Sequence, residues 1–120
     1  MENREYKVLL ADQLIGYSSF EGQGAPEGTV FGVLKFVPEL EGKEYNFIKN
    51  YCMEHSCEIR NDFTLEKIIA TGALDHMKVI APLQEEVFFK GNHISGMQGD
   101  GFDIVLEGVS DEDMERFFVG

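Results

Sequence analysis

The sequence contains no tryptophan, three prolines, three histidines, and ten basic residues against 22 acidic ones. The shortage of Lys and Arg excludes an ordinary nucleic-acid-binding surface, because such surfaces neutralise phosphates with basic side chains. The aromatic residues are interleaved with acids, whereas single-stranded nucleic acid is bound by stacking combined with positive charge. The same negative field would repel an anionic membrane. We therefore expect no direct binding to nucleic acid or to a membrane.

Long apolar runs are also missing: none approaches the roughly 18 residues that a membrane-spanning helix needs. The stretch Met1–Tyr6 lacks the charged-then-apolar pattern of a signal peptide. The only cysteines are Cys52 and Cys57, too few for a disulfide framework. These features predict a cytoplasmic protein with reduced thiols.

The chain is rich in material for a core, with 43% hydrophobic residues that include ten Phe and four Tyr. Its 120 residues predict a single domain over 1–120. A chain of this length buries roughly two-thirds of the surface that its unfolded form exposes. We therefore expect it to fold without a metal, a disulfide or a cofactor.

Runs rich in Val, Ile and Phe predict most of the strands. Within Thr29–Val37, even-numbered and odd-numbered residues should lie on opposite faces of the sheet. The Gly-rich stretch Glu21–Gly28 is predicted to be a loop. The second Gly-rich stretch, Gly91–Gly101, is predicted to be a loop or a wide hairpin turn. The strands are expected at Tyr6–Leu10, Leu14–Phe20, Thr29–Val37, Met77–Ala81, Val87–Lys90 and Phe102–Leu106.

Two helices are predicted. The first spans Gly42–His55, with Tyr45, Ile48, Tyr51 and Cys52 on one apolar stripe. The second is short, runs over Asp111–Phe118 and is capped by Ser110, with Met114, Phe117 and Phe118 docking on the sheet. Pro38 is expected to begin a helical turn, and Ser56–Asn61 to be a connection.

The segment Phe63–Thr71 fits either a helix or a buried strand, because period alone does not settle short apolar runs. The strand is slightly favoured. Strands, one helix, more strands and a terminal helix then follow in order. This order predicts an α+β fold: a mostly antiparallel sheet with one main helix packed on a face and a short C-terminal helix.

Cys52, His55 and Cys57 form a C-x2-H-x-C cluster of residue types that zinc accepts, and His76 or His93 would be the fourth ligand. The spacing differs from the usual paired hooks, and Cys52 lies on the apolar stripe, where buried thiols are common. We therefore favour a structural role and predict no metal. A cysteine nucleophile with one of these histidines as base is the other open interpretation, although no catalytic signature surrounds either cysteine.

The acidic residues are unevenly placed. Residues 1–60 hold ten acids and six bases, a net −4, whereas residues 61–120 hold twelve acids and four bases, a net −8. The stretch Asp100–Glu115 has seven acids and no base. This pattern fits either a solubilising surface or a surface that steers a basic partner into contact. Candidate partner-binding residues are Asp100, Asp103, Glu107, Asp111, Glu112 and Asp113, followed by Glu85 and Glu86.

Two stretches carry a resemblance: Leu14–Glu21 followed by Gly28–Pro38, and Ile104–Val109 before Phe117-Phe118. Together they resemble the small acidic immunity proteins of bacterial contact-dependent and other polymorphic toxin systems. The chain departs from the Asp-Pro-Pro loop of that group, having Gly24-Ala25-Pro26-Glu27 in its place. The resemblance implies a tight inhibitor of a cognate toxin, often a basic nuclease, and brings no catalytic residues.

The sequence thus favours a binding protein over an enzyme. The first hypothesis is an immunity protein whose acidic surface steers a basic toxin domain. The alternatives are an anti-defence protein that mimics DNA toward a DNA-binding enzyme complex, and a small enzyme that uses Cys52 or Cys57. The oligomeric state stays open.

Overall fold

The computed structural model of the protein describes residues 5–24 and 27–118. It is an α+β fold, as predicted. Its strands are β1 (Tyr6–Leu10), β2 (Gln13–Ser18), β3 (Gly22–Gly24), β4 (Thr29–Phe36), β5 (Ile59–Phe63), β6 (Ile68–Thr71), β7 (Met77–Ile80), β8 (Glu86–Val87), β9 (Gly91–Met97) and β10 (Gly101–Glu107). Its helices are the 3-10 turn η1 (Pro38–Leu40), α1 (Glu44–His55), α2 (Asp111–Asp113) and the π-helical turn η2 (Met114–Phe118).

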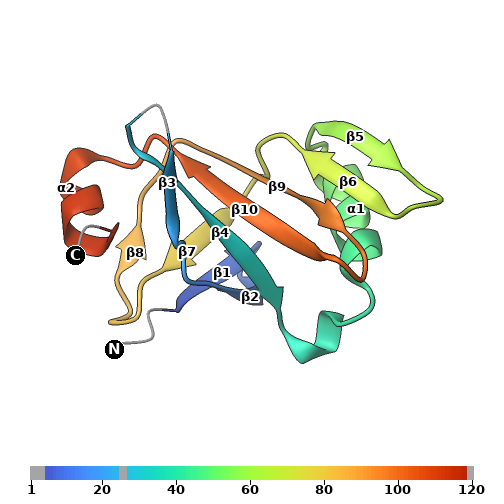
Figure 1. The fold of residues 1–120 in the computed structure, drawn as a ribbon, viewed down its shortest axis with the longest axis horizontal. Coiled ribbons are helices and arrows are strands. Elements are labelled where there is room, and N and C mark those ends of the chain that lie inside the picture. The colour runs from blue at the N-terminus through green and yellow to red at the C-terminus, as the bar shows by residue number, and fades with distance from the viewer. Residues whose placement is uncertain (1–4, 25–26, 119–120) are drawn as a thin grey trace.

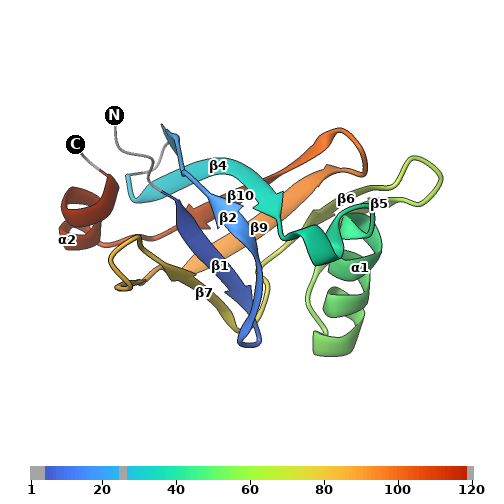
Figure 2. The ribbon, with the colours of Figure 1, turned by 90° about the horizontal axis from the view of Figure 1, so that it is seen from below.

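One antiparallel sheet holds all these strands, in the order β5-β6-β9-β10-β4-β2-β1-β7-β8, with β3 paired to β4. The sheet folds over on itself, so that β4, β10 and β9 face the viewer in Figure 1 and β1, β2 and β7 lie behind them. Helix α1 lies behind β5 and β6 at one end, and α2 lies at the other end (Figures 1 and 2). The fold-over encloses the core.

The fold-over depends on a close approach at Gly16. There β2 meets β4 through the pairs Gly16–Phe36 and Tyr17–Lys35 alone. A Cβ atom at Gly16 would clash with the carbonyl group of Lys35 and lie 3.0 Å from the Cα of Phe36. Only glycine lets the two backbones approach this closely, as expected for a glycine inside a strand.

Alternating burial confirms the predicted faces of β4. Val30, Gly32 and Leu34 point into the core, while Phe31 and Val33 point outward. The predicted stripe of α1 is confirmed too, since its four residues are buried. The core takes its largest fully buried side chains from Tyr6, Leu10, Ile15, Ile48, Ile69, Ile94, Ile104 and Leu106.

The predicted loop over Gly91–Gly101 is wrong for its first seven residues, which form strand β9. Asn92 and Ile94 are buried, and β9 pairs with β10 on one side and β6 on the other. At Gly96 an added Cβ would clash with Gly101 and Phe102 of the neighbouring strand. The glycine therefore serves close strand packing here, so its local preference for turns is overridden.

Several other predicted segments differ from the structure in part. The predicted connection Ser56–Asn61 is wrong in its second half, because β5 starts at Ile59. Within the ambiguous segment Phe63–Thr71, the strand interpretation is confirmed for Ile68–Thr71, which forms a hairpin with β5. The loop Glu21–Gly28 contains the short strand β3, and the strand expected at Val87–Lys90 ends at Val87. Hairpin pairing with the neighbouring strand decides these cases, and the period of the apolar residues alone does not show it.

The C-terminal segment closes one end of the core as predicted. Ser110 caps α2 by accepting a hydrogen bond from the Asp113 N–H at 3.2 Å. The Tyr6 hydroxyl donates to the Phe117 carbonyl oxygen at 2.5 Å. The ring of Phe118 stacks on Tyr6, with centroids 5.1 Å apart, and meets Phe20 edge-on at 5.9 Å. Aromatic packing thus fixes the end of the chain on the first strand.

Candidate functional site

The outward side of β4, β10 and β9, which we name the open face, is covered by no helix among residues 5–24 and 27–118. In Figure 2, helix α1 and the β9–β10 hairpin lie on opposite sides of the sheet. Three apolar side chains of the open face are substantially exposed: Phe31 at 42%, Val33 at 47% and Met97 at 38%. Exposed apolar side chains grouped on one surface are typical of a protein-binding site.

The sheet register interleaves acids with these apolar residues. Asp103 of β10 lies opposite Val33, and Val105 lies opposite Phe31. Glu107 is two residues beyond Val105 and therefore points to the same side. The rise of a strand separates Asp103 from Glu107 by roughly 13 Å. Asp100 is exposed in the turn that joins β9 to β10.

Small residues of β3 hold Phe31 in this position. A Cβ atom on Gly22 would overlap the Phe31 ring, and one on Gly24 would lie 3.4 Å from it. The ring therefore lies over the glycines of β3 and still keeps 42% of its surface exposed. The Glu21 carboxylate accepts a hydrogen bond from the Val33 N–H at 2.9 Å.

The structure separates the remaining predicted acids from the open face. Asp111 and Glu112 are exposed in the first turn of α2. Asp113 is buried, and its carboxylate accepts a hydrogen bond from the Phe88 N–H at 3.2 Å. Because the Asp113 side chain is buried and bonded within the protein, we exclude it from the proposed binding surface. Glu85 forms an ion pair with Arg116, and Glu86 is exposed on the edge strand β8.

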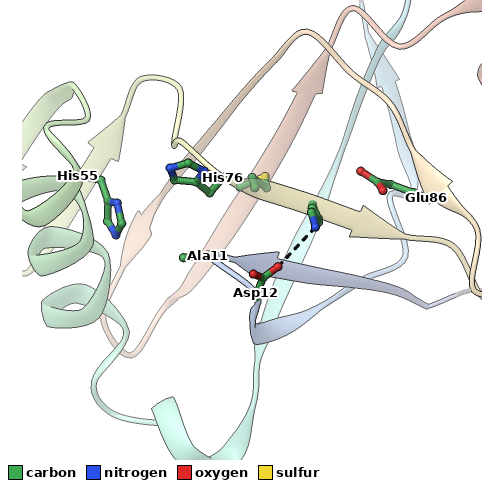
Figure 3. A pocket seen from close by; sticks show the side chains of 7 residues that line it. Ala11, Asp12, His55, His76 and Glu86 are labelled. Carbon is green, nitrogen blue, oxygen red and sulfur yellow. Dashed lines mark hydrogen bonds and ion pairs between the residues drawn. The ribbon is translucent and has the colours of Figure 1, made fainter.

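A concavity of about 480 Å³ lies between α1 and β7 (Figure 3). The imidazoles of His55 and His76 stand on one side of it, and Glu86 stands on the other. The ammonium group of Lys78 pairs with the carboxylate of Asp12 at 3.4 Å, so these two charges already compensate each other. The concavity is lined by Ala11, Asp12, His55, His76, Met77, Lys78 and Glu86.

The candidate zinc ligands do not converge. The His55 ring stacks on Tyr51 with centroids 4.1 Å apart, and His76 lies 5.9 Å from His55. His93 is on the open face, with its Nδ1 atom 3.9 Å from the Glu107 carboxylate. In the part of the chain that the structure describes, no three His, Cys, Asp or Glu side chains are arranged to hold a metal ion.

The buried cysteine is poorly suited to attack a molecule in solvent at neutral pH. Cys52 is 1% exposed, and burial, followed by the proximity of Cys57, raises the pKa of its thiol to about 11. A reactive cysteine instead needs a lowered pKa and access to solvent, because the thiolate is the nucleophile. Cys52 therefore packs as a small apolar side chain.

Sequence reasoning missed the exposed apolar residues of the site. The alternation puts Phe31 and Val33 on one face of their strand, but nothing local indicates which face the rest of the sheet covers. Met97 was placed in a loop. Further apolar residues follow Met97 across the sheet: Met97 pairs with Ile68, and Ile68 pairs with Phe63. Phe63 is 53% exposed.

No helix among the described residues is long and apolar enough to cross a lipid bilayer. In comparisons with known protein families, with curated proteins and with solved structures, nothing matches this chain.

Proposed function

We propose that the protein is an immunity or inhibitor protein that binds a basic partner, such as a nuclease-type toxin domain, through the open face. The observation that supports this most is the pairing of Asp103 with the exposed Val33, beside the exposed Phe31. Protein interfaces combine apolar and aromatic anchors with a polar rim. Here the rim residues Asp103, Glu107 and Asp100 are acids.

The charge of the chain indicates the chemistry of the partner. At a net charge of −12, the protein attracts a basic surface over distances of about a Debye length, roughly 8–10 Å at physiological salt. Phe31 and Val33 would then bury apolar area in the complex, while Asp103 and Glu107 pair with Lys or Arg of the partner. The exposed acids Asp111, Glu112 and Glu86 add to the long-range field in this proposal, whereas half-buried Glu85 is already paired with Arg116.

The burial and the raised pKa of the Cys52 thiol also favour a binding function over catalysis. The partner-binding proposal needs no perturbed acid, base or nucleophile at the open face. It needs a rigid surface, and strands paired on both sides supply one: β10 lies between β9 and β4, and β4 pairs with β10, β2 and β3. An interface on such strands loses little conformational freedom when it binds.

The experiment is affinity capture from the source organism's lysate with four baits: wild type, Asp103→Lys, Phe31→Asp and Glu54→Lys. Glu54 is an exposed acid of α1, so its reversal is a matched control for the change in net charge. We expect wild type and Glu54→Lys to retain one basic protein, and the two open-face variants to lose it. A partner retained equally by all four baits would contradict the proposed site.

The captured protein then decides the type of inhibition. A toxin domain whose lethality is suppressed by co-expression of wild type, but not of Asp103→Lys, supports the immunity function. A DNA-binding enzyme complex that duplex DNA displaces from the bait would support the DNA-mimic alternative in its place.

A further inference from the structure

The C-terminus of α1 brings the two cysteines together. Ser56 has φ 55° and ψ 37°, and the Cys57 N–H donates to the Cys52 carbonyl oxygen at 2.9 Å. A left-handed residue followed by this six-to-one hydrogen bond defines a Schellman motif. In that motif the side chains of the two bonded residues frequently contact each other. Here both of those side chains are thiols.

The surroundings place the Cys57 sulfur against Asp75, which Tyr51 of α1 also contacts. The Cys57 Sγ accepts the Asp75 N–H at 3.5 Å and lies 3.9 Å from the His55 carbonyl oxygen. The Tyr51 hydroxyl donates to the Asp75 carbonyl oxygen at 2.5 Å. Burial raises the pKa of Tyr51, and electrostatic interactions with Cys57, Asp75 and Cys52 add to that increase.

We propose that Cys52 and Cys57 are a thiol–disulfide exchange site that takes low-molecular-weight disulfides of the glutathione class and closes an intramolecular disulfide. This proposal is independent of the proposed binding function. Both cysteines are free thiols in the structure. The site occupies the helix end behind the sheet, away from the open face.

The exposure of the two residues sets the order of the steps. Cys57 is half-buried and Cys52 is buried, so a disulfide in solution meets Cys57 first. The Cys57 thiolate attacks one sulfur of oxidised glutathione, forming a mixed disulfide and releasing one glutathione thiolate. Cys52 then attacks the Cys57 sulfur, and its proton passes to the second glutathione as that glutathione leaves. The two protein thiols are oxidised, and one glutathione disulfide is reduced to two thiols.

Backbone geometry favours ring closure over a lasting adduct. Disulfides require Cα atoms roughly 4.4–6.8 Å apart. The hydrogen bond between the backbones of Cys57 and Cys52 holds these two residues within one helical turn of each other. The resolving thiol is therefore present at a high effective concentration as soon as the adduct forms.

The test incubates the reduced native chain with oxidised glutathione at neutral pH and follows the intact mass. Wild type should accumulate a monomer lighter by two hydrogen atoms, and peptide mapping should identify the Cys52–Cys57 bond. Cys52→Ala should stop at the glutathione adduct on Cys57. Cys57→Ala should stay unmodified under native conditions and react only in urea, because Cys52 is buried.

Wild type alone can overturn the proposal, so it does not depend on whether the variants fold. A stable glutathione adduct on wild type, a disulfide-linked dimer, or no reaction before unfolding would each show that the two thiols do not form an exchange site. Addition of a reducing dithiol should return the closed form to the starting mass.

Discussion

The carboxylate of Asp113 accepts a hydrogen bond from the backbone N–H of Phe88 at 3.2 Å. The Asp113 backbone N–H in turn donates to the capping hydroxyl of Ser110 at 3.2 Å. One acid of the C-terminal helix thereby satisfies a backbone donor next to the edge strand β8. Within the same turn, Asp111 and Glu112 point to solvent.

Replacing Asp113 with Ala should destabilise the fold, because it removes the acceptor for the Phe88 N–H. A hydrogen bond to a charged group contributes about 1.5–3 kcal/mol to the free energy of unfolding. Glu115→Ala, at an exposed acid of the adjoining turn, should change it by less than about 0.5 kcal/mol. Urea denaturation of both variants beside wild type measures the difference. Equal stabilities would contradict the internal role of Asp113.

The end of the chain offers a second test, at Phe118. Its ring stacks on Tyr6 and meets Phe20, so Phe118→Ala should lower the free energy of unfolding by about 2–4 kcal/mol. Phe88→Ala makes the same deletion at a ring that is 66% exposed, and we expect a change within about 0.5 kcal/mol. Thermal and urea unfolding would distinguish the two. If both variants are equally stable, the aromatic cluster does not fasten the C-terminus.

The backbone approach at Gly16 should make Gly16→Ala destabilising by about 1–3 kcal/mol, the usual cost of overpacking. Gly91→Ala is the matched control, since its Cβ would meet only Glu107 side-chain atoms at 3.4 Å and beyond. Gly91→Ala should raise the free energy of unfolding by roughly 0.4–1 kcal/mol, because alanine makes the unfolded chain less flexible. Comparing the denaturation midpoints tests the close approach directly. A stable Gly16→Ala variant would mean that β2 moves away from β4 without cost.

The contact between α1 and β5 should respond to acid. Hydrogen bonds from the Tyr45 hydroxyl and from the Lys49 ammonium group, the latter 2.9 Å away, lower the pKa of Asp62. The same partner, Asp62, is the main cause of the raised pKa of Lys49. Because the pKa of Asp62 is lowered by folding, its contribution to stability is present above about pH 3.9, the value of a free aspartate, and is lost as pH falls through the folded pKa.

Asp62→Asn should therefore be less stable than wild type at neutral pH and equally stable in strong acid. Because the pKa of Lys49 is raised by folding, its part of the contribution is lost as pH rises through the folded pKa of Lys49. Urea denaturation of both chains across the pH range measures the difference. A gap that does not narrow on acidification would show that the Asp62 carboxylate makes no ionised contacts.

Several parts of the fold could be predicted from the chain because their signals are local. The alternation of β4 follows from the two-residue period of a strand, and the stripe of α1 follows from the 3.6-residue period of a helix. Ser110 was identifiable as a cap because an oxygen side chain precedes a run of acids that favours a helix N-terminus. Each of these features depends on residues only a few positions apart.

What the sequence by itself determined is both helices, most of the strands, the α+β class and the negative charge of the chain. The tertiary structure decided that the glycine-rich stretch from Gly91 forms β9, because pairing with β6 and β10 outweighs a local turn preference. It also separated the acids, turning Asp113 inward and leaving Asp103 beside Val33. Exposure depends on which face of β4, β10 and β9 the folded-over strands β1, β2 and β7 cover, and that is a contact between distant segments that no local pattern contains.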